Sequence, residues 1–292
     1  ARHWLAAGLP AEAAEPLRHA AHVTERDGHV RHAMALLDER ESIVQDLGVP
    51  ETDAHRLRAW SHRATLDAYA SHLDLARAGV ERVLARVGPE APAPLRAAVY
   101  VDAGVVLHRL GRWADARAAL ERGRDAALEA GDQVRAGDAS WQLGWTLGNL
   151  GLGDEAEAAF HRALDHYGDR LEARANALQS LASLANSRGR PAAAEALLTE
   201  CVALRQRLGN QMRLDIATTY LANTRRLLGR PAEAEVLLRP ALVRLEANGF
   251  VQVVVSVGGA LRLAGEGFVT EGGYGDLAVE GGAVYVTDGS DA

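Results

Sequence analysis

The stretch LGNLGLGDEAEAAFHRAL, from Leu147 to Leu164, places Gly148, Gly151 and Gly153 directly before an alanine-rich segment. An interior glycine destabilises a helix by roughly 0.5 to 1 kcal/mol, so glycines beside such a strong helix former require an explanation. The same pattern recurs in LHRLGRWADARAALERG at 107–123, ANSRGRPAAAEALLTEC at 185–201 and RRLLGRPAEAEVLLRPA at 225–241. The opening stretch therefore belongs to an internal repeat.

Aligned glycines set the period of this repeat. They are Gly28, Gly111, Gly151, Gly189, Gly229 and Gly265, with Ser71 in the remaining position, at intervals of 36 to 43 residues. In each unit an apolar helical stripe of about 15 to 19 residues ends at the glycine, which can take the left-handed conformation that closes a helix. A second helix follows, and Pro191 and Pro231 fit its first turn because no amide donor is needed there. The period predicts an array of helical pairs.

Other small residues lie inside the helices and not at their ends. The position of Gly144 in the first helix is also occupied by Ala64, Gly104, Ala182, Ala222 and Gly258. The second helix carries a small residue at Ala76, Ala116, Ala156, Ala194 and Ala234. Small side chains at both positions predict a close approach of the two helices in each pair.

Together these residues resemble the tetratricopeptide repeat. In one unit the pattern reads Leu143, Gly144, Leu147, Gly151, Ala156, Phe160 and Ala163, and in another Tyr100, Gly104, Leu107, Gly111, Trp113, Ala116 and Leu120. The units run near 40 residues, against roughly 34 in the standard repeat, which is similar to kinesin-light-chain-like arrays with longer helices or turns. The resemblance implies an all-α fold, a right-handed α-α superhelix whose first helices line a concave groove.

The expected organisation has three parts. Residues 1–50 resemble edge helices of such arrays in multidomain signalling kinases and ATPases, and 51–248 carry the tandem units 51–90, 91–131, 132–169, 170–209 and 210–248. Residues 249–292 are expected to hold a degenerate terminal repeat helix and a glycine-rich acidic tail. The valine run within 250–264 suits a buried strand as well, but the continuing repeat register favours a helix. Beyond it, DLAVEGGAVYVTD predicts a short β-hairpin turning at Gly281 and Gly282, with a disordered end as the alternative.

Composition excludes several classes of function. The net charge of −7 argues against general binding to nucleic-acid phosphates, and all 32 basic residues are arginine, which excludes a P-loop or Schiff-base lysine. The single Cys201 cannot form an internal disulfide or a multi-cysteine zinc site. No apolar run is long enough to span a membrane and no secretion signal is present, so we expect a cytoplasmic protein. The chain begins at Ala1 and not at methionine, so we expect a fragment of a longer protein.

The resemblance places candidate binding residues on the groove face of the first helices. They are Asp102, Val105, His108 and Arg109; Trp141, Gln142, Trp145 and Asn149; Gln179, Ser183 and Asn186; and Tyr220, Asn223 and Arg226. The side-chain amides suit the backbone of an extended peptide, and Arg109 and Arg226 suit a carboxylate. Trp141 and Trp145, one turn apart, would form an aromatic shelf. The alternatives are a solvated surface for the amides and packing between helices for the tryptophans.

Sequence patterns of catalysis are missing: GxSxG, GxGxxG and HExxH do not occur. His19 with His22, and His29 with His32, have the spacing of two metal ligands on one helix face, but no third ligand is indicated. We therefore expect no enzyme activity, no metal and no other cofactor.

The sequence predicts a non-catalytic scaffold that binds a protein or peptide segment, with no direct contact to nucleic acid or membrane. The alternative is a regulatory or sensor arm of a larger signalling protein, such as a kinase, a signalling ATPase or a transcriptional activator, whose catalytic domain lies outside this fragment.

Overall fold

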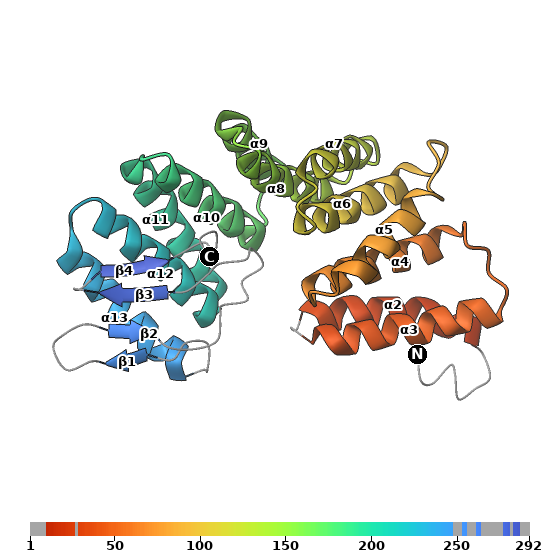
Figure 1. Ribbon diagram of the computed structural model, residues 1–292, viewed down its shortest axis with the longest axis horizontal. Coiled ribbons are helices and arrows are strands. Elements are labelled where there is room, and N and C mark those ends of the chain that lie inside the picture. The colour runs from red at the N-terminus through yellow and green to blue at the C-terminus, as the bar shows by residue number, and fades with distance from the viewer. Residues whose placement is uncertain are drawn as a thin grey trace. The chain divides into compact units, whose positions relative to one another are not determined.

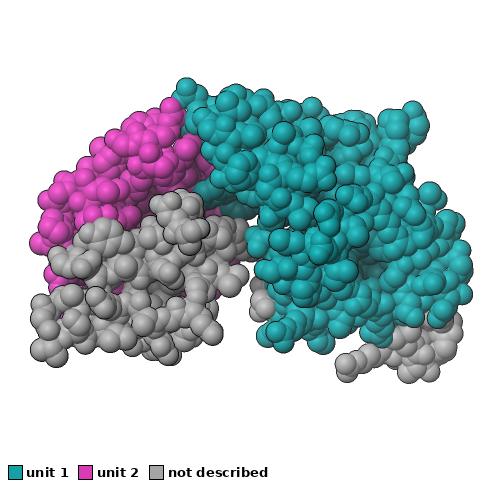
Figure 2. Space-filling model, viewed as in Figure 1, with its two compact units in different colours: residues 1–159 teal, residues 160–292 magenta. Residues whose placement is uncertain are grey.

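A computed structural model describes residues 10–26, 29–247, 253–255, 261–263, 277–280 and 283–286 (Figure 1). Twelve helices follow one another over residues 10–247, and four short strands follow them among the described residues. The prediction of an all-α array over the body of the chain is confirmed. The chain forms two compact units, residues 1–159 and 160–292 (Figure 2).

Within each unit the helices form antiparallel pairs of a first and a second helix. The first unit holds the pairs α2 (Pro10–Arg26) with α3 (Val30–Asp46), α4 (Ala54–Tyr69) with α5 (Leu73–Leu84), and α6 (Ala93–Arg109) with α7 (Trp113–Glu129), followed by the first helix α8 (Gln133–Asn149). The second unit holds the pairs α10 (Leu171–Ser187) with α11 (Pro191–Leu208), and α12 (Gln211–Leu227) with α13 (Pro231–Ala247), and α9 (Gly153–Tyr167) spans the boundary between the units. Within the first unit α6 packs against both α4 and α8, and within the second α10 packs against α12. First helices therefore lie beside first helices.

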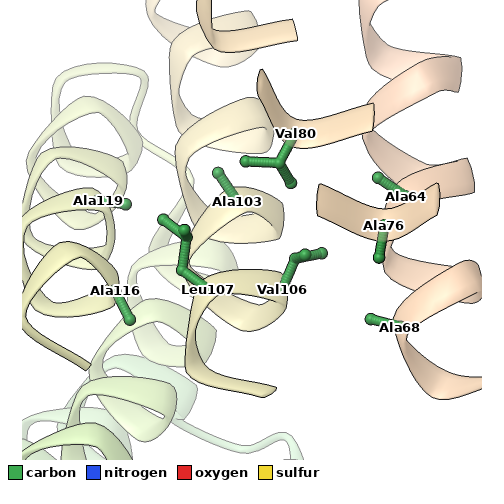
Figure 3. Close-up of a cluster of buried hydrophobic side chains, with 9 residues drawn as sticks. All are labelled: Ala64, Ala68, Ala76, Val80, Ala103, Val106, Leu107, Ala116 and Ala119. Atoms are coloured by element: carbon green, nitrogen blue, oxygen red, sulfur yellow. The ribbon is translucent and has the colours of Figure 1, made fainter. Parts of the chain in front are cut away.

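The apolar core continues from one pair into the next. One buried cluster joins four helices of the first unit (Figure 3). It consists of Ala64, Ala68, Ala76, Val80, Ala103, Val106, Leu107, Ala116 and Ala119. Figure 3 shows Val80 and Ala76 of α5 between the side chains of α4 and those of α6. Because α5 buries its apolar face against both neighbours, one pair alone cannot hide its own apolar surface.

Small residues inside the helices allow this close packing. A Cβ atom built on Gly104 of α6 would overlap the side chain of Leu120 on α7, and one built on Gly79 of α5 would lie 2.8 Å from the Cβ atom of Ala64 on α4. The sequence prediction of close approach is therefore confirmed at these pairs. Gly148 near the end of α8 differs, because a Cβ atom there would meet nothing within 4 Å.

The turns between first and second helices depend on a residue in the left-handed region. Gly111, Gly151, Gly189 and Gly229 have positive φ angles, of +75° at Gly151, as their alignment predicted. Ser71 takes the same conformation, with a φ of 61°, although it carries a side chain. The aligned Gly28 and Gly265 lie outside the described residues.

The expected helix over 250–264 is wrong where the structure describes that segment. Strands β1 (Val253–Val255) and β2 (Leu261–Leu263) pair antiparallel, with Val253 opposite Leu263. Consecutive valines lose side-chain freedom in a helix and favour extended backbone, which outweighs the repeat register here. Strands β3 (Leu277–Glu280) and β4 (Ala283–Val286) also pair antiparallel, as the hairpin pattern predicted. Gly281 and Gly282, where the turn was expected, lie outside the described residues.

We predict that Ser71→Gly stabilises the protein by about 1 kcal/mol. An L-residue in the left-handed conformation costs roughly 1 to 2 kcal/mol, and the larger entropy that glycine loses on folding offsets part of the gain. Urea unfolding measures the difference. The matched control, Gly111→Ser, should lose about 1 to 2 kcal/mol at the equivalent turn. Equal stability of all three proteins would contradict a shared turn geometry.

Alanine at the two helical glycines should have opposite effects. Gly104→Ala should destabilise the protein by about 1 to 3 kcal/mol, because the new methyl group overlaps Leu120. Gly148→Ala should stabilise it by about 0.5 to 1 kcal/mol, because the site is open and alanine is the better helix former. Thermal unfolding of both variants checks the pair, and a stabilising Gly104→Ala would disprove the close approach.

Candidate functional site

The predicted binding residues divide between the two units. In the first unit they lie on α6 and α8, and in the second on α10 and α12. Most are half-buried: Asp102, His108, Arg109, Trp141, Gln142, Trp145, Gln179, Ser183, Asn186, Tyr220, Asn223 and Arg226, whereas Asn149 is exposed. Val105 is buried, so its expected place on the binding face is wrong; it packs in the core between helices.

A polar relay crosses from α6 to α8. His108 Nδ1 lies 3.0 Å from Thr146 Oγ1, and that hydroxyl donates to the carbonyl of Gln142 at 2.9 Å. Since the hydroxyl proton is used, the histidine must donate through Nδ1, which leaves Nε2 as an acceptor facing Asn149 Nδ2 at 3.5 Å. Burial, together with the charge of Arg109, lowers the pKa of His108 and favours this neutral form.

The second unit repeats the relay with a different donor. Asn186 Nδ2 donates to Thr224 Oγ1 at 2.8 Å, and the Thr224 hydroxyl donates to the carbonyl of Tyr220 at 3.0 Å. His108 and Asn186 each stand three residues before their aligned glycine, and each threonine stands five before the next one in its unit. Each relay therefore fixes the register between adjacent first helices, and part of the expected binding set is engaged within the fold.

The two predicted arginine anchors are also engaged. Arg109 Nε donates to the carbonyl of Ala68 at 3.2 Å, and its guanidinium lies 4.7 Å from the ring centroid of Tyr69. Arg226 donates to Asn223 Oδ1 through Nε at 3.3 Å and through an NH2 group at 3.2 Å. Both guanidinium groups are therefore held by neighbours in the fold, and a carboxylate ligand would compete with those contacts.

Asp102 is a half-buried carboxylate whose pKa is raised. Ser61 Oγ donates to Asp102 Oδ2 at 2.8 Å from the neighbouring helix α4. Burial raises the pKa of Asp102, although Arg135, the Ser61 hydrogen bond, His62 and Arg58 act in the opposite direction. No guanidinium donates directly to this carboxylate among the described residues, which is why burial dominates.

Several polar groups of the predicted set remain available. The side-chain amides of Gln142 and Gln179 make no hydrogen bond to any residue the structure describes. Asn186 Oδ1 is buried and has no hydrogen-bond partner. Ser183, one turn after Gln179, donates to the Gln179 carbonyl at 3.1 Å and so lies against its own helix. The available groups are therefore amides, with Trp141, Trp145 and Tyr220 as half-buried aromatic neighbours.

The sequence pattern did not predict two groups of residues that the structure brings together. Thr146 and Thr224 complete the relays, and their common position five residues before a glycine was the available signal. His22, Glu25 and His62 converge near the N-terminal helices and offer a set of metal-ligating atoms. The sequence gives His22 and Glu25 as neighbours on a helix, but only the packing of α4 adds His62.

Comparisons with known proteins follow this arrangement of paired helices. A family model described as tetratricopeptide repeat matches residues 174–208, which span most of α10 and all of α11. Residues 174–208 therefore carry a tetratricopeptide repeat. No curated protein sequence matches the chain significantly.

Solved structures with tetratricopeptide repeats and related arrays share the fold. A signal transduction ATPase with numerous domains from Pyrococcus horikoshii, which has a tetratricopeptide repeat sensor, is 14% identical with a TM-score of 0.64, covering 80% of this chain and 36% of that chain. BtubC (BKLC) from P. vanneervenii is 18% identical with a TM-score of 0.58, covering 84% and 96%. A Rap protein complexed with competence and sporulation factor is 14% identical with a TM-score of 0.59, covering 82% and 67%.

At these identities the likeness concerns the fold alone. This chain spans about a third of the length of the ATPase, 36%. Among the described residues, no helix combines the length and the apolar character that crossing a membrane requires.

We predict that Asp102→Asn leaves the repeat array as stable as the parent, or more stable, near pH 7. The folded state raises the pKa of Asp102 above the unfolded value of about 3.9, so the folded protein holds this proton more tightly than the unfolded chain does. The contribution of Asp102 to the free energy of unfolding therefore falls as the pH rises from the unfolded pKa to the folded pKa. The ionised carboxylate therefore opposes folding at neutral pH. Urea unfolding at about pH 7 and about pH 3 should show the advantage of the variant vanish in acid.

Asp215→Asn is the matched control, because Asp215 is buried and accepts from Arg244 Nε at 3.0 Å on both carboxylate oxygens. Loss of this charged pair should destabilise the protein by about 1 to 3 kcal/mol at neutral pH. An equal loss in Asp102→Asn would contradict the electrostatic account of that residue.

Proposed function

We propose that the chain is a non-catalytic scaffold that binds a protein or peptide segment on the exposed side of its first helices. This first-helix face consists of Gln142, Trp145 and Asn149 on α8 in the first unit, and of Gln179 and Asn186 on α10 in the second unit. Helical arrays of this kind use such extended surfaces for binding. The available groups on the face are amides, which recognise peptide backbone without demanding a particular side chain.

The observation that carries the proposal is the buried Asn186 Oδ1 atom without a partner. A buried acceptor left unsatisfied costs about 1 to 3 kcal/mol. Because the Oδ1 atom is enclosed, an incoming N–H donor would recover this free energy once the Asn186 side chain turns toward solvent. Gln179 lies seven residues earlier on α10, which is two helical turns and about 10 Å along the axis. An extended segment covers that distance in about three residues. The two amides therefore suit two backbone groups of one extended peptide.

Trp145 and Asn149 offer the corresponding features in the first unit. They stand four residues apart on α8 and therefore share one side of that helix. A half-buried tryptophan next to an exposed amide provides an apolar anchor and a hydrogen-bonding group together. This combination favours a peptide over a small polar ligand.

The likeness to the Rap complex supports a peptide or protein ligand, since that protein is complexed with competence and sporulation factor. The likeness to the sensor-containing ATPase favours a second function, in which the array is the sensing arm of a larger cytoplasmic signalling protein. The two are compatible in chemistry, because a sensor of this class also binds a partner. They differ in whether the gene encodes a catalytic domain beyond this segment, which sequencing of the full reading frame decides.

A display library of random peptides, selected on the wild-type chain, tests the binding proposal. For the selected peptides we expect Gln179→Ala to weaken affinity about 3- to 10-fold, the effect of one hydrogen bond. Trp145→Ala should weaken affinity about 30-fold or more in peptides that use the first unit, as expected for an aromatic anchor. Isothermal titration calorimetry gives these ratios directly.

Gln206→Ala provides the matched control, because Gln206 is an exposed amide on the second helix α11. Its affinity should equal that of the wild type. Unchanged binding in Gln179→Ala and Trp145→Ala, or an equal loss in Gln206→Ala, would exclude the first-helix face as the binding surface. Circular dichroism and melting temperature confirm that each variant is folded.

A further inference from the structure

Three potential metal ligands converge between α2 and α4 in the first unit. His62 Nε2 of α4 lies 2.8 Å from Glu25 Oε2 of α2, and His22 Nδ1 of α2 lies 3.6 Å from the same oxygen. The three ligand atoms all lie within 4.8 Å of one another. The two imidazole rings are 6.0 Å apart between centroids and inclined at 69°, so both present a nitrogen to one carboxylate without stacking.

In the repeat register, this cluster occupies first-helix positions at which later units carry candidate binding residues. His22 and Glu25 stand six and three residues before the aligned Gly28, and His62 stands nine before Ser71. The equivalent positions in later units hold Asn186, three before its glycine, and Asp102, nine before its glycine. The cluster is therefore the part of the first-helix series in which histidines and a carboxylate replace amides.

We propose that His22, Glu25 and His62 bind a Zn²⁺ ion. Two imidazoles and one carboxylate are a ligand set that zinc takes in proteins, with bonds of about 2.0 to 2.2 Å. Ligands at those bond lengths in tetrahedral geometry stand about 3.3 Å apart. The separations of 2.8 and 3.6 Å lie on either side of that value, so small side-chain rotations bring both pairs to it.

The ligand chemistry selects among metals. Imidazole nitrogens favour zinc and its transition-metal neighbours, whereas magnesium and calcium prefer sites made of oxygen atoms. His22 and Glu25 come from one helix at an i, i+3 spacing, and the third ligand, His62, comes from α4, 37 residues after Glu25. Zinc bound here would therefore join α2 to α4 and fix the first pair of the array on its neighbour.

The surroundings of the cluster suit an exchangeable ion. The His22 side chain is 59% exposed, which gives the ion an entry path, while His62 and Glu25 are 17% and 24% exposed and hold their positions by packing. Three protein ligands leave a fourth position for water.

Titration of tag-free, chelator-treated protein with Zn²⁺ by calorimetry tests the site. We expect one ion per chain, and an affinity loss of more than about 100-fold in His62→Gln and in Glu25→Gln, exceeding the loss typical of a supporting residue outside the ligand set. Glu25→Gln keeps the size of the side chain, so it remains informative if His62→Gln unfolds. Magnesium and calcium in large excess should not displace the zinc. Cobalt substitution should give the intense visible absorption of a tetrahedral site.

His19→Gln is the matched control, because His19 is an exposed histidine on α2 outside the cluster. The Zn²⁺ affinity of His19→Gln should stay within about threefold of the wild-type value, a free-energy difference smaller than the contribution of one hydrogen bond. An equal loss in His19→Gln would assign the zinc to surface histidines and overturn the proposal. Absence of binding in the wild type, or wild-type affinity in both His62→Gln and Glu25→Gln, would overturn it as well.

Discussion

Close contact between paired helices is the constraint on which the structure depends. The first and second helices approach until the residue at one position must be glycine or alanine, as the overlap of a Gly104 methyl group with Leu120 shows. The second helix then has an apolar side left over, which α5 buries between α4 and α6. The left-handed residue in the turns that begin at Ser71, Gly111, Gly151, Gly189 and Gly229 follows from the same requirement, because the chain must reverse within two or three residues.

Packing of this kind leaves the exposed side of the first helices free to vary, and the chain uses that freedom in three ways. His108 and Asn186 tie neighbouring first helices together through buried threonines. Gln142, Gln179 and the Asn186 carbonyl oxygen keep hydrogen-bonding capacity that the fold does not use. In the first unit, His22, Glu25 and His62 form a cluster of potential metal ligands on α2 and α4. First helices therefore carry contacts within the fold, unused hydrogen-bonding groups and candidate metal ligands.

Much of the fold was predictable because its determinants are local. Gly151 ends a helix for reasons present in its immediate neighbours, and the small residues recur at a fixed period. The site was less predictable because its contacts join residues about 40 positions apart. The bonds from Arg109 to Ala68 and from His108 to Thr146 depend on how far one pair is rotated against the next, which the sequence pattern does not contain. The strand at 253–255 was not predicted, because the preference of valine for extended backbone and the repeat register, which favours a helix, point to different structures there.

Hydrogen exchange with a selected peptide bound is the measurement that tests the account most directly. If the first helices present the binding surface, amide exchange should slow in α8 and α10 when peptide is added, while the exposed second helices α7 and α11 keep their rates. Protection concentrated in α7 or α11, with α8 and α10 unchanged, would contradict the central claim that paired-helix packing leaves the first-helix face available for another chain.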